Sequence, residues 1–272
     1  MTTFETPGRV ALRVGIQGGD IAIETWEAPT TEVEITALRS DETTTAAVEE
    51  LQVSARERPD GLTEVVVEQP RKRGGFLSRG PSIGVRVRCP VGTAVEATTS
   101  SADVRGVGRF GDVAVKTASG DTAFDHVEGA CRINSASGDV RIGTGEGPIT
   151  LNTASGDVHV GLARGPLSAN LVSGDATVVE ARDALSLNTV SGDQLIEASG
   201  GAPVRLQSVS GDVRIDLRPG LRLWIDATSV SGSLRSELEP SEEAPAGIEP
   251  VGELRIRTIS GDVNIGRALA AA

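Results

Sequence analysis

The sequence is poor in aromatic residues and carries an excess of negative charge. Its 272 residues include four Phe, two Trp and no Tyr, and the formal net charge is −12. Binding of single-stranded nucleic acid uses aromatic side chains as stacking platforms, and binding of phosphate needs a basic surface. The lack of aromatic side chains also disfavours a stacking platform for carbohydrate. The composition therefore predicts no nucleic-acid partner.

Cysteines and long apolar runs are also scarce. Cys89 and Cys131 are too few for a disulfide framework, and we expect each to be a small, buried, reduced residue. The first residues lack the basic and apolar regions of a signal peptide. The sequence also has no run of about 18 apolar residues, the length that could span a membrane. The expected location is the cytoplasm, and export by a non-standard route is the alternative.

The motifs of common enzymes are missing or lack their structural context. His126 and His159 are the only histidines, and they take different positions in the repeat described below, so they suggest no shared metal site or catalytic triad. Residues 106–111, Gly-Val-Gly-Arg-Phe-Gly, match a dinucleotide fingerprint by letter. A strand-like run follows them instead of the helix that would bind pyrophosphate. We expect no enzyme activity, no catalytic residue, no cofactor and no metal.

An internal repeat dominates the sequence. The tripeptide Ser-Gly-Asp recurs every 18 residues, with its serines at Ser119, Ser137, Ser155, Ser173 and Ser191. The period then loosens, and the equivalent serines are Ser210, Ser231 and Ser260. A fixed period of this length is typical of repeat architectures, in which each unit stacks on its neighbour.

Each repeat contains two short runs that alternate between apolar and polar residues. Positions 3 and 5 after the serine are mostly apolar, as in Val140 and Ile142, and so are positions 12 and 14, as in Ile149 and Leu151. Position 17 is Ala or Val in five consecutive repeats. Alternation with period two predicts strands, and the Gly-Asp and Gly-Pro pieces between the runs predict turns. Each repeat therefore reads as strand, turn, strand, turn.

A column of asparagines favours stacked coils over an antiparallel meander. Equivalent residues of stacked coils lie about 4.8 Å apart, so side-chain amides can bond along the stack. In a meander the same residues would be two strands apart. The predicted fold is all-β, a single-stranded β-solenoid similar to a parallel β-helix with coils of ~18 residues, and the number of sides stays open. The predicted ladder comprises Asn134, Asn152, Asn170 and Asn188.

The Ser-Gly-Asp tripeptide is expected at a corner of each coil. Glycine adopts unusual backbone angles there, and the Asp and Ser side chains can bond backbone groups that the corner leaves unpaired. The stacked carboxylates would repel one another by about 0.9 kcal/mol per neighbouring pair in water. Cation binding by this column is an alternative, although calcium takes six to eight oxygens. The predicted corner residues are Gly120, Asp121, Gly138, Asp139, Gly156, Asp157, Gly174, Asp175, Gly192, Asp193, Gly211, Asp212, Gly261 and Asp262.

The rest of the chain divides into an irregular start and two charged loops. Residues 1–98 show the same alternation of apolar and polar residues but lack the 18-residue period, so we expect degenerate coils or a cap. Within them we expect a helix over residues 42–56, with Ser40 or Asp41 as its N-cap. We expect a basic, glycine-rich loop at residues 71–81 to be a solvated loop or to bind an anion.

The regular repeats are expected over residues 99–266. An acidic insertion at residues 237–252 interrupts them, and residues 267–272 form a tail. The coil that contains Val263 and Ile265 comes last in the sequence, so we expect it to end the stack with an open edge.

The repeats resemble a known family. The run of Ser-Gly-Asp-Val-Arg-Ile units and the preceding strand at residues 85–92, Val-Arg-Val-Arg-Cys-Pro-Val-Gly, are similar to a bacterial β-strand-repeat family catalogued as a "putative adhesin" domain of unknown function. The similarity covers about residues 10–266. It implies a β-solenoid and suggests adhesion, and it brings no catalytic residues.

These observations favour a non-enzymatic β-solenoid that serves as a scaffold or protein-interaction module. Its partner is unknown, and self-association through the end coils is one form that the interaction can take. An adhesin-like surface-binding protein is the alternative. A carbohydrate-active enzyme on a β-helix is less favoured, because turns this short do not build the walls of a substrate groove.

Overall fold

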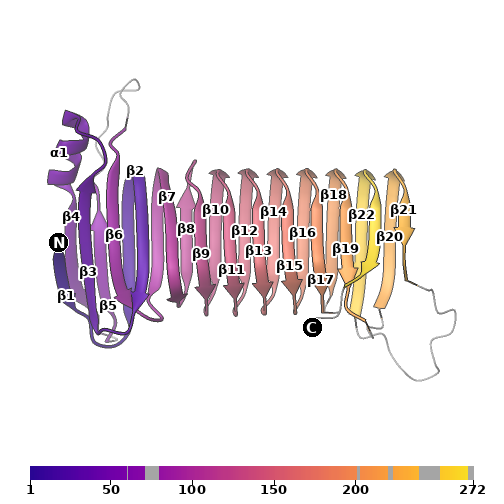
Figure 1. Cartoon of the computed structure of the whole chain (residues 1–272), viewed down its shortest axis with the longest axis horizontal. Helices are drawn as coiled ribbons and strands as arrows, with labels where there is room; N and C mark the ends of the chain where they lie inside the picture. Colours follow the sequence, from indigo (N-terminus) through magenta and orange to yellow (C-terminus); the bar gives the residue numbers. More distant parts are fainter. Residues whose placement is uncertain (60, 71–79, 201–202, 220–222, 239–251, 269–272) are drawn as a thin grey trace. The chain divides into compact units, whose positions relative to one another are not determined.

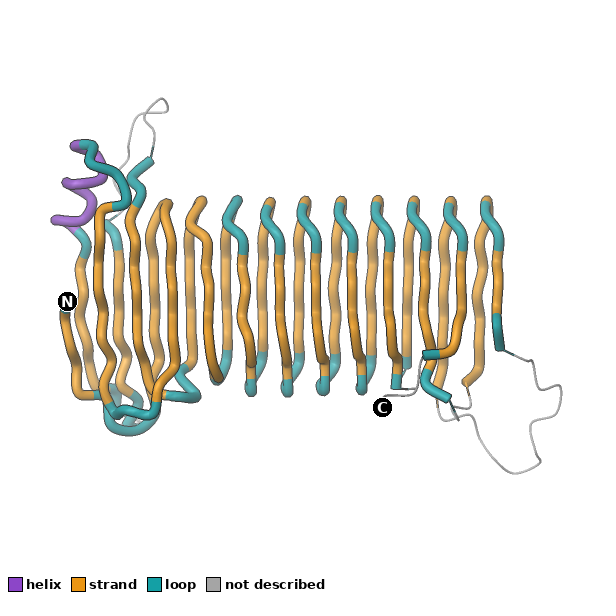
Figure 2. Tube along the Cα trace, viewed as in Figure 1, coloured by secondary structure: helices purple, strands orange, loops and turns teal. Residues whose placement is uncertain are grey.

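The computed structural model describes residues 1–59, 61–70, 80–200, 203–219, 223–238 and 252–268. They form two compact units, which divide after Val140. Strands dominate both units, as Figures 1 and 2 show. The predicted fold class, an all-β solenoid, is confirmed. The basic residues 71–79 and the acidic residues 239–251 lie outside the described residues.

Unit 2 is a stack of coils, and each coil contributes one strand to each of two parallel rows. The coil therefore has two sides, which the sequence left open. In spatial order the first row comprises β12 (Ile149–Ser155), β14 (Leu167–Ser173), β16 (Leu185–Ser191), β18 (Val204–Ser210), β22 (Gly252–Ser260) and β20 (Leu223–Ser231). The second row comprises β13 (Val158–Ala163), β15 (Ala176–Ala181), β17 (Gln194–Ser199), β19 (Val213–Leu217), β23 (Val263–Arg267) and β21 (Leu234–Ser236).

The repeat of 18 residues sets the register of these strands. Asn152 pairs with Asn170, and Asn170 pairs with Asn188, without a shift. Because side chains alternate between the two faces of a strand, the same positions of every coil point inward. Leu151 and Leu187, for example, are fully buried. The alternation seen in the sequence thus becomes a continuous apolar core between the two rows.

The last two coils are stacked out of sequence order. Strand β22 lies between β18 and β20, and β23 lies between β19 and β21. The prediction that the coil of Val263 and Ile265 ends the stack is therefore wrong, and residues 223–236 form the terminal coil. The inward side chains give the physical reason. Ile256 and Ile265 need a neighbour on both sides, whereas their counterparts in the terminal coil are the smaller Ala227 and Ser236.

Unit 1 starts with strands of mixed direction. Its parallel strands are β2 (Val10–Trp26), β5 (Thr63–Glu68), β6 (Ile83–Pro90), β7 (Ala94–Phe110), β8 (Val113–Thr117), β9 (Thr122–Val127) and β10 (Cys131–Ser137). Strand β11 (Val140–Gly145) begins at the last residue of the unit. The antiparallel additions are β1 (Thr2–Glu5) on β3 (Thr30–Ala37), β3 on β6, and β4 (Gln52–Glu57) on β5.

The helix α1 (Glu42–Glu50) is shorter than the predicted span. Asp41 caps it, since its carboxylate accepts the N–H of Thr44 at 2.8 Å. Residues 52–57 form β4 instead, in which Val53 faces Val67 and Ala55 faces Val65 across an antiparallel pair. This pairing satisfies the backbone groups that a longer helix would have satisfied internally, and it uses the alternation of Val53 and Ala55.

Candidate interaction surface

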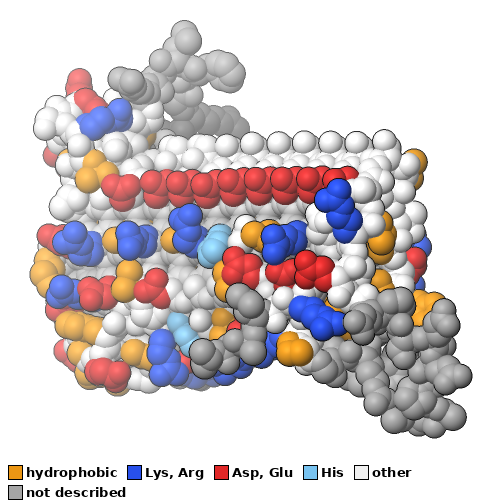
Figure 3. Space-filling model, turned by 45° about the vertical axis from the view of Figure 1, so that its right-hand side comes forward, with side chains coloured by type: hydrophobic (Ala, Val, Ile, Leu, Met, Phe, Trp, Pro, Cys, Tyr) orange, Lys and Arg blue, Asp and Glu red, His pale blue; other side chains and the backbone are white. Residues whose placement is uncertain are grey.

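The corners of unit 2 carry a column of carboxylates that we call the aspartate ladder. Each carboxylate accepts the backbone N–H of the residue stacked on it, at distances of 2.7–2.9 Å. The predicted role of Asp, bonding a backbone group at the corner, is what these contacts show. In Figure 3 exposed acidic side chains form a straight row. The ladder runs through Asp157, Asp175, Asp193, Asp212 and Asp262 and ends on the N–H of Ser233.

Unit 1 repeats the same arrangement on a smaller scale. Asp121 donates its N–H to Asp103, and Asp139 donates its N–H to Asp121, both at 2.9 Å. The pKa of Asp262, at the far end of the ladder in unit 2, is lowered by the N–H of Ser233. One carboxylate oxygen of each accepting aspartate thus holds the neighbouring coil.

Glycine at the corner is required by close approach as well as by backbone angle. Gly192 has φ +134°, and a Cβ at this position would lie 2.1 Å from the carbonyl oxygen of Gly174 in the neighbouring coil. No L side chain fits a contact this short. The same geometry recurs at the other corners of unit 2, namely Gly174, Gly211 and Gly261.

The asparagines of unit 2 form a second ladder on the outer face of the first row. Asn170 donates its amide N–H to the side chain of Asn152 at 2.9 Å, and Asn188 donates to Asn170 at 2.9 Å. Asn134 lies in unit 1, in register with Lys116. The side-chain amides of unit 2 thus bond along the stacking direction.

An exposed apolar column runs beside the asparagine ladder, and we call it the apolar ridge. The residue before each corner serine, at position 17 of the regular repeats, falls out of phase with the inward positions. In these coils its side chain points to solvent and is 44–75% exposed. Strand pairing places them next to one another across five coils. Contiguous exposed apolar side chains of this kind mark interaction sites. The ridge consists, in spatial order, of Val172, Val190, Val209, Ile259 and Val230.

Two exposed arginines lie on the same face as the ridge. Arg257 is two residues from Ile259 in β22, so the two side chains leave the same side of the strand. Arg205 also points outward in β18, where it is paired with Arg255 and lies four residues from Val209. Both side chains are exposed, and neither forms an ion pair with any residue that the structure describes. Arg255, by contrast, pairs with Asp226 and Glu253.

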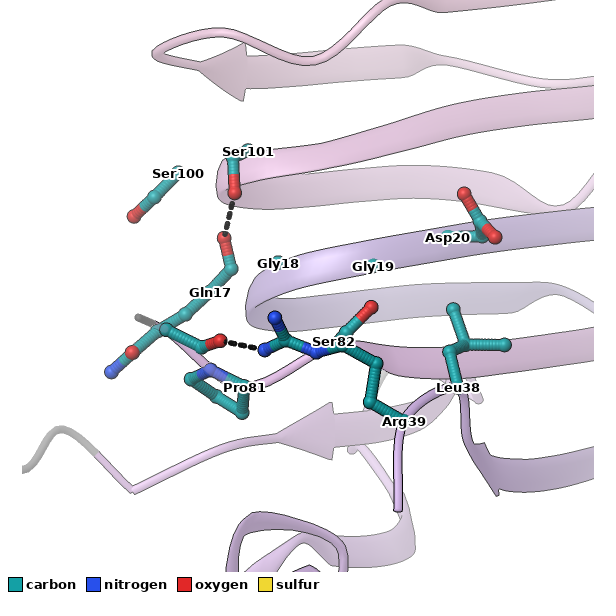
Figure 4. A pocket seen from close by; sticks show the side chains of 11 residues that line it. Gln17, Gly18, Gly19, Asp20, Leu38, Arg39, Pro81, Ser82, Ser100 and Ser101 are labelled. Carbon is teal, nitrogen blue, oxygen red and sulfur yellow. Dashed lines mark hydrogen bonds between the residues drawn. The ribbon is translucent and has the colours of Figure 1, made fainter. Parts of the chain in front are cut away.

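Unit 1 contains a polar pocket of 460 Å³ beside the first corner of β2. Gln17, Asp20, Arg39, Ser82 and Ser101 contribute side chains to it, and Figure 4 shows Ser100 and Ser101 on one side of Gln17 and Pro81 on the other. The guanidinium of Arg39 is already engaged by the carbonyl of Gly80 and by Asp41, whose carboxylate lies 3.2 Å from Nε. The pocket offers hydrogen bonds to a polar molecule.

The remaining candidate groups are two histidines and two cysteines. His126 lies in β9 of unit 1 and His159 in β13 of unit 2. Cys89 and Cys131 are buried, and burial raises the pKa of their thiols to about 11 and about 12 respectively. Thiols in such surroundings are unreactive. Among the described residues, no three His, Cys, Asp or Glu side chains gather as metal ligands.

Comparison with known proteins defines the family. The model of the Toastrack DUF4097 family matches residues 10–266, so the chain belongs to this family of domains of unknown function. No curated protein matches the chain. The helix that the structure describes is neither long enough nor apolar enough to cross a membrane.

Two solved structures are similar to the chain at low identity. A "putative cell adhesion protein" from Clostridium sporogenes has 10% identity and a TM-score of 0.30, with 96% of this chain and 93% of that chain covered. A "putative lipid binding protein" from Parabacteroides distasonis has 13% identity and a TM-score of 0.49, with 97% and 95% covered. Neither similarity tells what this chain binds.

Proposed function

We propose that this protein is a non-enzymatic β-solenoid whose function is to bind another protein through the apolar ridge of unit 2. The observation that carries the proposal is the ridge itself, because five β-branched side chains stand exposed in one straight column while their neighbours are polar. A stable sheet face does not need apolar side chains in outward positions. Their alignment over successive coils supports a surface that is covered by a partner.

The ridge by itself supplies a modest free energy of binding. Covering a half-exposed Val or Ile contributes about 1 kcal/mol, and association costs about 4–15 kcal/mol in lost freedom of motion. Five such residues therefore roughly match the lower end of that cost. The neighbouring amides and cations must add hydrogen bonds and ion pairs, and we expect a reversible interaction.

Capture from an extract of the source organism tests the proposal. The variant Val172→Ser/Val190→Ser/Val209→Ser changes exposed side chains only, so it is expected to fold normally. The control variant Val91→Ser/Val107→Ser changes two exposed valines of unit 1. Proteins retained by the wild type and by the control should be lost from the ridge variant. Equal retention by all three would contradict the proposal.

Self-association through the terminal coil is a second candidate, because this coil exposes apolar groups. Trp224, Ile225 and Leu234 are exposed, although the positions of Ile225 and Leu234 are core positions in other coils. Within the described residues no strand pairs with the outer edge of β20. Sedimentation velocity over a range of concentrations tests this candidate, and Ile225→Ser/Leu234→Ser should abolish any dimer that the wild type forms. A monomeric wild type would contradict it.

A further inference from the structure

We infer that the occupant of the apolar ridge is an amphipathic α-helix of a partner protein, which lies along the stacking direction and places an acidic flank beside Arg205 and Arg257. This inference rests on the proposed function and specifies the chemistry of the partner. The direction of the ridge, its repeat distance and the charges next to it each support this choice.

The direction of the ridge decides the orientation of the occupant. The five side chains come from five different strands, so their column crosses the strands. A segment that ran parallel to the strands would touch one or two of them. An elongated occupant that covers all five must follow the stack for about 19 Å, since neighbouring strands are about 4.8 Å apart.

The repeat distance favours a helix over an extended chain. An α-helix advances about 5.4 Å per turn and brings one or two residues of its apolar stripe to the contact in each turn. An extended chain brings a side chain to the same face every 6.6 Å or so. The helix therefore keeps close to the repeat of the ridge over four intervals, whereas the extended chain loses register after the second.

The arginines on the same face as the ridge favour a helix with carboxylates on the flank that faces them. The outer face of β14 and β16 is uncharged, since its outward side chains are Ser, Asn and Val. Farther along the stack Arg257 lies two residues from Ile259 in β22, and Arg205 lies one outward position farther from the ridge in β18, opposite Arg255. A helix with carboxylates on the flank that faces these arginines gains two ion pairs, while a basic flank would meet like charge.

Peptide binding tests the inference directly. The probe is a synthetic helical peptide of about 20 residues, long enough to hold its helix, with a leucine stripe and a glutamate flank. One comparison peptide carries lysine in place of glutamate, and another carries a central proline that breaks the helix. Affinity is measured by fluorescence anisotropy near physiological salt, and methyl NMR signals of the valines and isoleucines locate the site.

The expected result is that the glutamate peptide binds more tightly than the lysine peptide, although the protein is negatively charged overall. The net charge of −12 favours the lysine peptide at long range, and salt screens exposed charges beyond about 8 Å. The aspartate ladder lies closer, since Asp175 is three residues from Val172, so the glutamate flank must face Arg257 and not the ladder. The glutamate peptide should therefore bind more tightly and shift the methyl signals of Val172, Val190, Val209 and Ile259. The ridge variant should weaken binding about tenfold. Arg257→Glu should weaken it several-fold and favour the lysine peptide.

Matched controls separate local contacts from general effects. Val91→Ser/Val107→Ser and Arg132→Glu, all exposed sites of unit 1, should leave the affinity within about twofold of wild type. The inference is overturned if the glutamate peptide does not bind, if the lysine or proline peptide binds equally well, or if the controls weaken binding as much as the ridge variant.

These outcomes differ from a failure of the proposed function. If the glutamate peptide fails while the ridge variant still loses its captured proteins, the ridge binds something other than a helix and the proposed function stands. If the ridge variant captures the same proteins as wild type, the proposed function falls, and the inference falls with it.

Discussion

Each unit ends its stack of strands by a different device. In unit 1 the outer strands β1 and β4 belong to antiparallel pairs, so the direction of pairing changes before the edge is reached. In unit 2 the terminal coil keeps the parallel pairing and reduces the size of its inward side chains, with Ala227, Ser229 and Ser236 in core positions. Unit 1 thus abandons the parallel repeat at its edge. Unit 2 keeps the repeat and reduces the apolar surface that another coil would cover, although Ile225 and Leu234 remain exposed.

The largest loss of stability is expected at a tightly packed corner of unit 2, compared with a glycine near the start of unit 1 that has free space around it. Gly192→Ala should lower the free energy of unfolding by about 4 kcal/mol or more, because the added Cβ meets a carbonyl oxygen and the backbone is left-handed. Gly8→Ala should lower it by about 1–2 kcal/mol, since Gly8 has φ +101° but no atom within 4 Å of the added Cβ. Urea denaturation measures both. Similar losses at the two sites would show that backbone angle alone matters.

A comparison of the inserted coil with the terminal coil predicts an intermediate effect. Ile256→Ala removes a fully buried side chain and should lower the free energy of unfolding by about 2–5 kcal/mol. Ile225 is paired with Leu254 in the neighbouring strand but is 38% exposed, so Ile225→Ala should lower it by about 1 kcal/mol. Equal losses in denaturation experiments would mean that another segment covers the terminal coil.

Acid pH should destabilise the terminal coil of unit 2 and the helix α1 of unit 1 by a smaller amount. Backbone N–H groups lower the pKa of Asp262 at the terminal coil and of Asp41 at the helix cap below the ordinary value of 3.8. The stabilisation that these carboxylates give is therefore complete well above pH 3.8 and is lost as the pH falls below it. Asp262→Asn keeps the acceptor oxygen and should flatten the pH dependence of the melting temperature between pH 5 and 3. A parallel pH dependence in wild type and variant would refute this.

The regular coils could be predicted from the sequence because every level of their structure repeats together. The spacing of 18 residues sets the length of a coil, the alternation sets the two rows, and the Asn and Asp columns set the stacking. The exposed ridge carried a signal as well, since position 17 is apolar but out of phase with positions 12 and 14. That this position lines up as one exposed apolar column was not predicted.

The order of the last coils could not be predicted from the repeat, because Ser231 and Ser260 fit the same register. Ser210 pairs with Ser260, and Ser260 pairs with Ser231, so either order satisfies the corner contacts. The distinguishing signal is side-chain size, since Ala227 and Ser236 in core positions indicate a terminal coil. The extent of α1 was overestimated for a similar reason, since the pairing of β4 with β5 depends on residues far apart in the sequence.

The order of the coils determines which coil is terminal and where Arg257 lies relative to the ridge. Cysteine pairs test it, since a disulfide requires Cα atoms within about 7 Å. Gln207 pairs with Arg257, and Thr228 lies one strand beyond Arg257. The account predicts that Gln207→Cys/Arg257→Cys forms a disulfide under mild oxidation, detected by peptide mass spectrometry, and that Gln207→Cys/Thr228→Cys does not. The opposite result would show that the coils stack in sequence order.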